Sequence, residues 1–281
     1  MDFFQIAVLA TVQGAAELLP VSSSAHVITA EKLMGLDPTS PEMTMLLVML
    51  HTGTMFAVIL YFWRSWKYAY FRSWSAFRDN AVIVLAATAA TGIVGLGLLA
   101  LIKHAVMGSD PGFEIEHLFG NPKLMAAALA AAGLLIIGSS FIPERSNRGL
   151  TLWRSVLVGA VQGLCLPFRG FSRSGATIST ALAMGVARRR AEEFSFALAV
   201  VLTPAVIVKE AHRLLGAHAL APQASGASLW QTLTPGLIGM VLSFFAGLLA
   251  LRWLSGWLES GRWHLFGAYC LAAAGFVLWQ G

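Results

Sequence analysis

Long windows without a charged residue dominate the hydrophobic pattern of this chain. Five windows of 18 to 22 residues contain no Asp, Glu, Lys or Arg, and they cover residues 46–63, 81–102, 124–142, 232–251 and 263–281. An α-helix needs about 20 apolar residues to cross the hydrocarbon core of a bilayer. A sixth window, residues 194–208, is shorter and contains Pro204. The pattern predicts an all-α integral membrane protein with six transmembrane helices.

Four further apolar stretches are too short to cross a bilayer. They have 13 or 14 residues each and cover residues 3–16, 18–30, 155–168 and 174–187. Each would reach only about 20 Å as a helix, against a hydrocarbon core of about 30 Å. The stretches form two pairs, one broken near residues 20–24 and the other near residues 167–173. Such pairs are typical of re-entrant helical hairpins that are buried in protein or line a cavity.

The two halves of the chain resemble each other. Gln13 and Gly14 recur 149 residues later. Six more residues recur at a shift of 150 positions. They are Ser22, Ser24, Ile28, Met34, Gly35 and Glu42, which match Ser172, Ser174, Ile178, Met184, Gly185 and Glu192. Each half contains one hairpin and three spans, and an odd number of spans inverts the second half. We therefore expect one membrane domain, residues 1–281, in which residues 1–142 and 152–281 are inverted repeats with the site at their interface.

The placement of charge predicts the orientation in the membrane. Basic residues cluster within residues 64–78, 145–154 and 188–190, whereas the loop 103–123 is slightly acidic. The positive-inside rule places the three basic clusters in the cytoplasm. Both termini then lie outside, the first hairpin enters from outside and the second enters from the cytoplasm.

Composition excludes a soluble globule. Only 12% of the residues are charged, against about 25% in an average soluble domain, and 57% are hydrophobic. The net charge of +5 belongs to the basic loops, so no nucleic-acid partner is expected. Asp2 stands where a cleaved signal would be basic. Cys165 and Cys270 lie in apolar segments and are interpreted as core residues.

The first break carries candidate catalytic groups. Gln13 and Glu17 are four residues apart, so on a helix they share a face and can address one ion or phosphate. An ionisable group in this apolar context costs about 2.5 to 3.5 kcal/mol on insertion scales. The alternative is a carboxylate that reaches a nearby interface. Ser22, Ser23 and Ser24 place hydroxyl and N–H groups at the start of the next helix, a phosphate-binding arrangement.

His26 and the second break complete the candidate site. His26 follows Ser23 by one helical turn and can reach the same ligand, or can form a hydrogen bond between helices. Arg173 occupies the repeat position of Ser23, and a guanidinium donates bidentate hydrogen bonds to phosphate. Uncharged flanking segments argue against a topology-determining arginine. Arg169 is either a second phosphate ligand or a loop charge.

These two breaks resemble the undecaprenyl pyrophosphate phosphatases of bacteria, also called the bacitracin-resistance family. The first family signature is matched by Gln13, Glu17, residues 20–23 and His26, and the second by residues 170–177. The resemblance continues through Met184, Gly185 and residues 193–196, and the span pattern covers the whole chain.

The resemblance implies hydrolysis of undecaprenyl pyrophosphate to undecaprenyl phosphate and inorganic phosphate, which recycles the lipid carrier for peptidoglycan synthesis, cell shape and bacitracin resistance. Ser23 would attack the terminal phosphorus, with His26 as base or later proton donor, and Arg173 would stabilise the phosphoryl oxygens. Glu17 and Gln13 would hold a divalent cation, Mg²⁺ or Ca²⁺. Further expected substrate contacts are Gln13, Ser22, Ser24, Ser172, Ser174 and Thr177. The resemblance also suggests a homodimer in the bacterial inner membrane, with an active site that opens to the periplasmic side.

Two departures and three rival interpretations accompany this resemblance. In the second break, Arg169 replaces a family proline, and one residue is inserted after Gln162. In the first break, Gln13 stands at an acidic position of the family, so Glu17 is the only carboxylate of that signature. The loss of one carboxylate predicts weaker metal dependence. A metal-held water could attack in place of Ser23. Inverted repeats are also typical of transporters, so a transporter or flippase of polyprenyl phosphate lipid is the alternative function. The acid-phosphatase type of lipid phosphatase is disfavoured, because its Lys-led Arg-Pro signature and second His-Asp pair are absent from the sequence.

Overall fold

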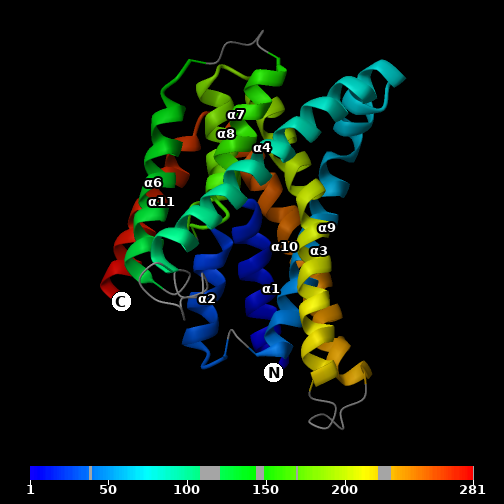
Figure 1. The fold of residues 1–281 in the computed structure, drawn as a ribbon, viewed down its shortest axis with the longest axis vertical. Coiled ribbons are helices and arrows are strands. Elements are labelled where there is room, and N and C mark those ends of the chain that lie inside the picture. The colour runs from blue at the N-terminus through cyan, green and yellow to red at the C-terminus, as the bar shows by residue number, and fades with distance from the viewer. Residues whose placement is uncertain (38–39, 108–120, 144–148, 169, 221–228, 281) are drawn as a thin grey trace. The chain divides into compact units, whose positions relative to one another are not determined.

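The chain is all-helical wherever its structure is described. The computed structural model describes all residues except 38–39, 108–120, 144–148, 169, 221–228 and 281. Over these described residues it contains ten α-helices and no β-strand (Figure 1). In chain order the helices are α1 Phe3–Leu18, α2 Ser23–Leu33, α3 Pro41–Tyr70, α4 Trp74–Met107, α6 Pro122–Ser140, α7 Leu152–Leu164, α8 Arg173–Ala183, α9 Arg188–Leu220, α10 Leu229–Glu259 and α11 Trp263–Gln280. The predicted all-α class is confirmed.

Four helices are long and apolar enough to cross a membrane, among the residues that the structure describes. Their candidate spans are Met43–Tyr70, Trp74–Ala105, Pro122–Ser140 and Leu233–Glu259. Each contains most or all of one window predicted from the sequence. The other two predicted windows fall on α9 and α11, and their crossing of the membrane stays a prediction. The acidic residues of the loop 103–123, which was expected on the outer face, lie within residues 108–120 and so outside the described residues.

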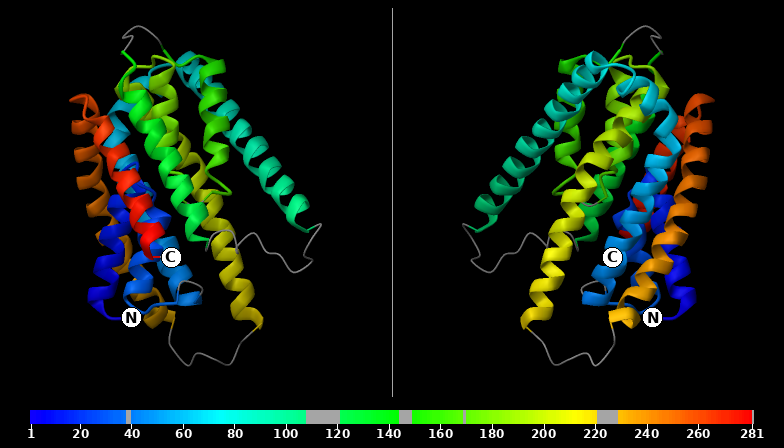
Figure 2. Two further views of the ribbon diagram at one scale, coloured as in Figure 1. Left: turned by 90° about the vertical axis from the view of Figure 1, so that its left-hand side faces the viewer. Right: turned by 90° about the vertical axis from the view of Figure 1, so that its right-hand side faces the viewer.

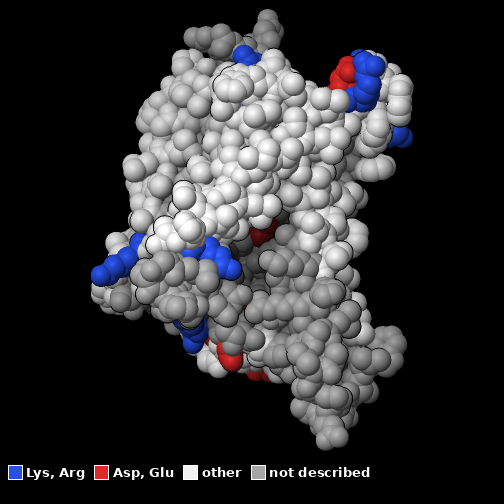
Figure 3. All heavy atoms as spheres, viewed as in Figure 1, with Lys and Arg blue, Asp and Glu red and all other residues white. Residues whose placement is uncertain are grey.

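The surface of α4 shows why a membrane suits these helices. Large apolar side chains are exposed along it, and Leu85, Ile93 and Leu96 each retain more than 60% of their accessible surface. In Figure 3 the visible surface of α4 is white between charged groups at its two ends. A monomeric soluble protein rarely exposes so continuous an apolar surface. Exposed Trp63 and Trp74 flank the turn between α3 and α4, and tryptophans in such positions are typical of the aromatic belts of membrane proteins.

Helix lengths follow a similar pattern in the two halves of the chain, with two short helices, two long helices and one of intermediate length. The first half runs 16, 11, 30, 34 and 19 residues (α1, α2, α3, α4 and α6). The second half runs 13, 11, 33, 31 and 18 residues (α7 to α11). Ser23 is the first residue of α2 and Arg173 the first residue of α8. The two residues matched by the sequence repeat therefore begin equivalent helices.

The second helix of each pair also ends in the same way. Gly35 and Gly185 have φ angles of 68° and 77°, which glycine adopts without the penalty that a Cβ brings. After α2, the amide of Leu36 donates to the carbonyl of Glu31 at 2.9 Å. After α8, the amide of Val186 donates to the carbonyl of Ala181 at 3.0 Å. Both are glycine-terminated helix ends that satisfy carbonyl groups of the last turn.

By its internal contacts the chain divides into two compact units, each built from segments of both halves. Unit 1 comprises Met1–Leu18, Ser23–Phe62 and Ala199–Trp253, and unit 2 comprises Leu19–Ser22, Trp63–Leu198 and Leu254–Gly281. Because these units do not follow the repeat boundaries, the repeats at residues 1–142 and 152–281 stay a prediction.

Unit 1 is held together by apolar packing and by close approach of helices. Its core cluster comes from α1, α2 and α3 and consists of Ile6, Leu9, Ala10, Val27, Met43, Leu46 and Leu50. A Cβ on Gly14 of α1 would lie 2.6 Å from the Cβ of Ala246 in α10. Ser243 of α10 donates to the carbonyl of Leu50 in α3 at 2.9 Å. Small residues at such crossings let membrane helices pack without a hydrophobic driving force.

Unit 2 contains two tight helix pairs. Figures 1 and 2 show α6 and α11 side by side, and a Cβ on Gly133 would lie 2.8 Å from the carbonyl oxygen of Gly267. The second pair is α4 and α7. Gln162 of α7 donates to the hydroxyl of Thr91 in α4 at 3.1 Å, and that hydroxyl donates to the carbonyl of Gly159 at 2.9 Å. Polar groups thus link helices where no water competes.

Candidate active site

The end of α1 gathers polar side chains around one carboxylate oxygen, Oε2 of Glu17. The hydroxyl of Ser23 donates to it at 2.6 Å, and the amide nitrogen of Gln13 lies 3.3 Å away. Gln13 is buried, and the Glu17 side chain keeps 17% of its exposure. The predicted shared face of Gln13 and Glu17 is confirmed. All three residues belong to unit 1.

Helix ends explain how this group is positioned. Glu17 lies in the last turn of α1, where the partial negative charge of the helix end disfavours a carboxylate. Its charge-assisted hydrogen bond with Ser23 offsets that cost. The four residues between α1 and α2 reverse the chain, and Ser22 adopts a left-handed φ of 69°. Such a conformation costs a non-glycine residue about 1 to 3 kcal/mol and is typical of functional loops.

His51 of α3 joins the same carboxylate. Its Nε2 lies 3.6 Å from Glu17 Oε2, and its Nδ1 lies 2.8 Å from the carbonyl oxygen of Leu47. The imidazole keeps 37% of its exposure, so the protein encloses it only partly. Three segments of unit 1 therefore meet at Glu17: the end of α1, the start of α2 and the middle of α3.

Sequence reasoning missed His51. The window of residues 46–63 was recognised by its lack of Asp, Glu, Lys and Arg, and histidine was not counted among the charged types. An ionisable side chain inside a predicted span was the available signal, because such residues face the protein interior or a water-filled cavity.

The remaining predicted residues of the first break lie on or beside α2. Ser22 is buried, and His26 is partly exposed on α2, one turn after Ser23. The side chain of Ser24 lies outside the described part of the structure. Their roles in catalysis or substrate binding stay predictions.

The second break holds its hydroxyl groups inside unit 2. Ser172 caps α8, because its Oγ accepts a hydrogen bond from the amide of Gly175 at 3.2 Å. Ser174 donates to the carbonyl of Leu19 at 3.3 Å, and Thr177 shares a hydrogen bond of 2.6 Å with Ser195. All three predicted substrate-binding residues are buried, so these bonds fix the conformation of the loop.

Arg173 is partly exposed at the start of α8, next to the capping residue Ser172. The N-terminus of a helix favours anions, and a guanidinium there adds to this preference. Arg169, the residue that replaces the family proline, lies outside the described residues. Neither of its two predicted roles is tested.

Glu193, in the last stretch of the family resemblance, has a structural environment. Its carboxylate accepts hydrogen bonds from Ser65 and from Arg189 and Arg190, the two arginine contacts being 3.2 Å each. The indole of Trp66 donates to the carbonyl of Glu193 at 3.3 Å. Within unit 2 this network ties the end of α3 to the start of α9. The carboxylate of Glu193 thus partly neutralises the positive charge of Arg189 and Arg190.

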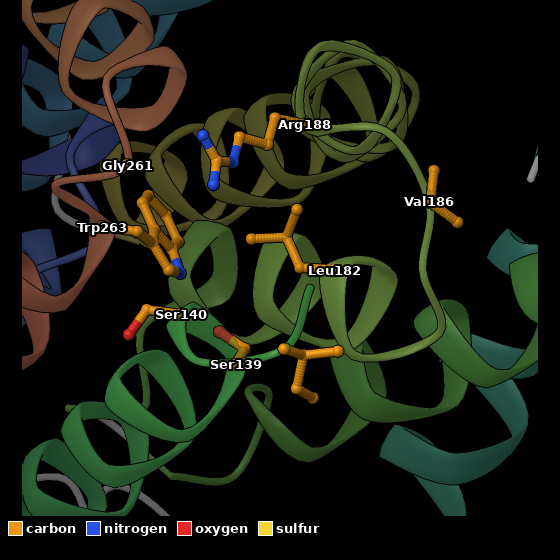
Figure 4. A pocket seen from close by; sticks show the side chains of 8 residues that line it. Ser139, Ser140, Leu182, Val186, Arg188, Gly261 and Trp263 are labelled. Atoms are coloured by element: carbon orange, nitrogen blue, oxygen red, sulfur yellow. The ribbon is translucent and has the colours of Figure 1, made fainter. Parts of the chain in front are cut away.

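A small pocket of unit 2 lies at the other end of α8. It is lined by Ser139, Ser140, Ile142, Leu182, Val186, Arg188, Gly261 and Trp263 (Figure 4). The Arg188 guanidinium donates to the carbonyl of Glu259 at 3.1 Å, and the Trp263 indole donates to Ser179 at 3.0 Å. No predicted site residue lines it.

The donors around Glu17 suit a divalent cation. A carboxylate and an amide oxygen are ligands that Mg²⁺ and Ca²⁺ prefer, and the oxygen and nitrogen of the Gln13 amide can exchange places by rotation. Among the described residues, no group of three His, Cys, Asp or Glu side chains could hold a metal by itself. A cation here would therefore share its coordination with Gln13 and with oxygens of a phosphate substrate.

Comparison with known protein families identifies the same family as the signatures in the two breaks. A family model described as "Bacitracin resistance protein BacA" matches residues 6–276. The chain belongs to this family. The match covers both breaks and all ten described helices in whole or in part, so the resemblance read from the two signatures is confirmed.

Named relatives are similar over their whole length. Undecaprenyl-diphosphatase 2 of Acinetobacter baylyi is 63% identical over 278 residues, which cover 99% of this chain and 98% of that protein. Undecaprenyl-diphosphatase of Acidiphilium cryptum is 34% identical over 277 residues, covering 94% and 93%. Undecaprenyl-diphosphatase of Korarchaeum cryptofilum is 30% identical over 290 residues, covering 96% of each. The similarity therefore extends over more than nine tenths of each chain rather than over single motifs.

Proposed function

We propose that this chain is a membrane phosphatase that hydrolyses undecaprenyl pyrophosphate to undecaprenyl phosphate and inorganic phosphate. The reaction recycles the lipid carrier for cell-wall synthesis. Membership of the BacA family and relatives named undecaprenyl-diphosphatase support this assignment. The observation that carries it is the hydrogen bond from Ser23 to Glu17, which supplies a hydroxyl nucleophile with an adjacent proton acceptor at 2.6 Å.

In the proposed reaction, Ser23 Oγ attacks the terminal phosphorus. The new Oγ–P bond forms as the bond from phosphorus to the bridging oxygen breaks, so undecaprenyl phosphate leaves. Water then hydrolyses the phosphoserine to inorganic phosphate. Glu17 is positioned to accept the hydroxyl proton, and His26, the base expected from the sequence, remains a candidate for that role or for protonating a leaving group.

Arg173 is proposed to stabilise charge on the same phosphoryl group. Its guanidinium can donate two parallel hydrogen bonds to the equatorial oxygens. Ser174, its neighbour, bonds to the carbonyl of Leu19, four residues before Ser23. The proposal that both breaks serve one pyrophosphate rests on the family membership of the chain. Ser22, Ser24, Ser172 and Thr177 are the further proposed contacts, through hydroxyl or backbone groups.

A divalent cation held by Glu17 and Gln13, Mg²⁺ or Ca²⁺, is also proposed. When bound it would neutralise charge on the pyrophosphate. The rival mechanism, in which a metal-held water attacks and Ser23 is only a ligand, uses the same residues. A transporter of polyprenyl phosphate lipid is the second candidate function, and the similar pattern of helix lengths in the two halves favours it.

Phosphate release by the purified chain separates hydrolysis from transport. We expect undecaprenyl pyrophosphate in detergent to yield inorganic phosphate, and Glu17→Gln to lower the rate about a hundredfold or more, because the amide neither accepts the Ser23 proton nor neutralises a cation. Glu259→Gln, a change at an exposed residue at the end of α10, is the matched control and should keep the parent rate. Absence of phosphate release by the parent, or equal rates for Glu17→Gln and the parent, contradicts the proposed hydrolysis.

The proposed membrane arrangement has six spans, two re-entrant hairpins and an active site that opens to the periplasmic side. The arginines and lysine near the turn between α3 and α4 support a cytoplasmic position for that turn. A homodimer, suggested by the family resemblance, is part of the proposal.

Labelling with a membrane-impermeant maleimide tests this arrangement. In intact cells Asp2→Cys is expected to react, whereas Ser75→Cys, at the start of α4, should react only after permeabilisation. Both positions are exposed, so accessibility of the side chain does not distinguish them. Reaction of Ser75→Cys in intact cells is incompatible with the proposed orientation.

A further inference from the structure

The hydrogen bond of His51 to Leu47 determines where the imidazole carries its hydrogen. A backbone carbonyl can only accept, so Nδ1 of His51, 2.8 Å from the Leu47 oxygen, is the donor. In a neutral imidazole the other ring nitrogen then carries a lone pair. That nitrogen, Nε2, is the one that lies 3.6 Å from Glu17 Oε2. In this neutral form two lone-pair acceptors face each other across this distance.

A cation between two such acceptors turns their repulsion into coordination. We propose that His51 Nε2 and Glu17 Oε2 are joint ligands of one divalent cation. This inference rests on the proposed function, because it adds a nitrogen ligand to the site assigned to Glu17 and Gln13. It also compensates for the missing carboxylate at Gln13, since an imidazole nitrogen is a stronger metal ligand than a neutral amide oxygen.

The separation of the two atoms is compatible with shared coordination. Ligands about 2.1 Å from a metal lie about 3.0 Å apart in octahedral geometry and about 3.4 Å apart in tetrahedral geometry. The observed 3.6 Å is about 0.2 Å longer than the tetrahedral value and about 0.6 Å longer than the octahedral value.

The surroundings of His51 are those of a metal-binding histidine. Such residues almost always donate their second N–H to a carboxylate, a carbonyl or water, which fixes the ring and raises the basicity of the ligating nitrogen. Leu47 lies one turn before His51 on α3 and provides this acceptor. Ser243 of α10 holds the next part of α3 through the carbonyl of Leu50. The proposed ligand His51 therefore belongs to a helix rather than to a loop.

The ligand set predicts which ions and which substrate the site favours. One carboxylate with a neutral imidazole and a neutral amide leaves a divalent site with a net charge of +1, which attracts a pyrophosphate. An imidazole ligand shifts preference from Ca²⁺ and Mg²⁺ toward transition-metal ions, among which Mn²⁺ is the one that also suits the carboxylate and amide oxygens. Mn²⁺ is also paramagnetic, so its ligands can be identified directly.

Pulsed electron paramagnetic resonance of bound Mn²⁺ tests the assignment without measuring activity. The full chain in detergent with one equivalent of Mn²⁺ is expected to show electron spin-echo modulation from a directly coordinated ¹⁴N nucleus. His51→Ala should lose this modulation and bind Mn²⁺ at least about tenfold more weakly, because even loss of an outer-shell partner costs 10- to 100-fold in affinity. His51→Gln, which keeps the side-chain reach and offers oxygen, should also lose it and guards against misfolding of the alanine variant.

His26→Ala is the matched control, because it removes the other histidine near Ser23, and it is expected to retain the modulation. Loss of the signal in His26→Ala but not in the His51 variants overturns the assignment, as does a parent protein without ¹⁴N coupling or without bound Mn²⁺. Phosphate release is measured on the same samples. Hydrolysis without nitrogen coupling defeats only the ligand assignment, whereas nitrogen coupling without hydrolysis defeats only the proposed phosphatase function.

Discussion

Ser23→Ala is expected to lower the turnover of undecaprenyl pyrophosphate by about a thousandfold or more. The substitution removes the oxygen that attacks phosphorus and the hydrogen bond of 2.6 Å to Glu17. Loss of the nucleophile in a serine protease lowers kcat by about 10⁶-fold. A smaller loss is expected here, because phosphoryl transfer depends mainly on positioning and charge stabilisation, and water can replace the nucleophile at a site that still binds the phosphate.

A covalent intermediate distinguishes this mechanism from direct attack by water. Acid quenching of the parent during a single turnover should trap phosphoserine, which mass spectrometry can locate at Ser23. Ser75→Ala, which truncates an exposed serine of α4, is the control that should retain parent turnover and the intermediate. If no phosphoserine forms and Ser23→Ala keeps turnover within about tenfold of the parent, Ser23 is not the nucleophile.

Features that depend on neighbouring residues could be predicted from the sequence. Four of the predicted spans coincide with helices long enough to cross, because the cost of burying charge in lipid leaves uncharged windows. The two breaks were also placed within a few residues. Ser23 and Arg173 begin α2 and α8, because proline and polar groups end one helix before the next can start.

Contacts that depend on the path of the chain were harder to predict. Helical spacing placed His26 one turn after Ser23, whereas the hydroxyl of Ser23 bonds to Glu17 across the reversal of the chain. That reversal needs the left-handed backbone conformation of Ser22, and a serine in the sequence does not predict such a conformation. His51 reaches Glu17 from another helix, and only the packing of α3 brings it there.

The hydroxyl groups of the second break show a different limit. Ser172, Ser174 and Thr177 were expected to contact phosphate because of their residue type and position. In a buried loop each hydroxyl must find a partner, and these three bond to an amide, a carbonyl and another hydroxyl of unit 2. A sequence pattern identifies the donors, but it does not tell which of them the fold itself will occupy.

Arg173→Lys is expected to lower kcat by about a hundred- to a thousandfold. Lysine keeps the positive charge but loses the planar pair of donors that matches two phosphoryl oxygens. Removal of one preorganised donor to a developing charge costs about 2.7 to 4 kcal/mol in other enzymes, which corresponds to this loss of rate. If the arginine acts mainly on the transition state, KM should change much less than kcat.

The same substitution separates catalysis from topology. The positive-inside rule counts lysine and arginine alike, so a purely topological Arg173 would tolerate the change. Arg154→Lys is the matched control: Arg154 is partly exposed near the start of α7, donates to the carbonyl of Gly149 at 2.6 Å and should keep parent turnover as lysine. Turnover by correctly inserted Arg173→Lys within about threefold of the parent, well under 1 kcal/mol, refutes the catalytic role. In that case the positive charge of Arg173 would suffice, and the stabilising donors for the phosphoryl group would have to come from backbone amides at the start of α8.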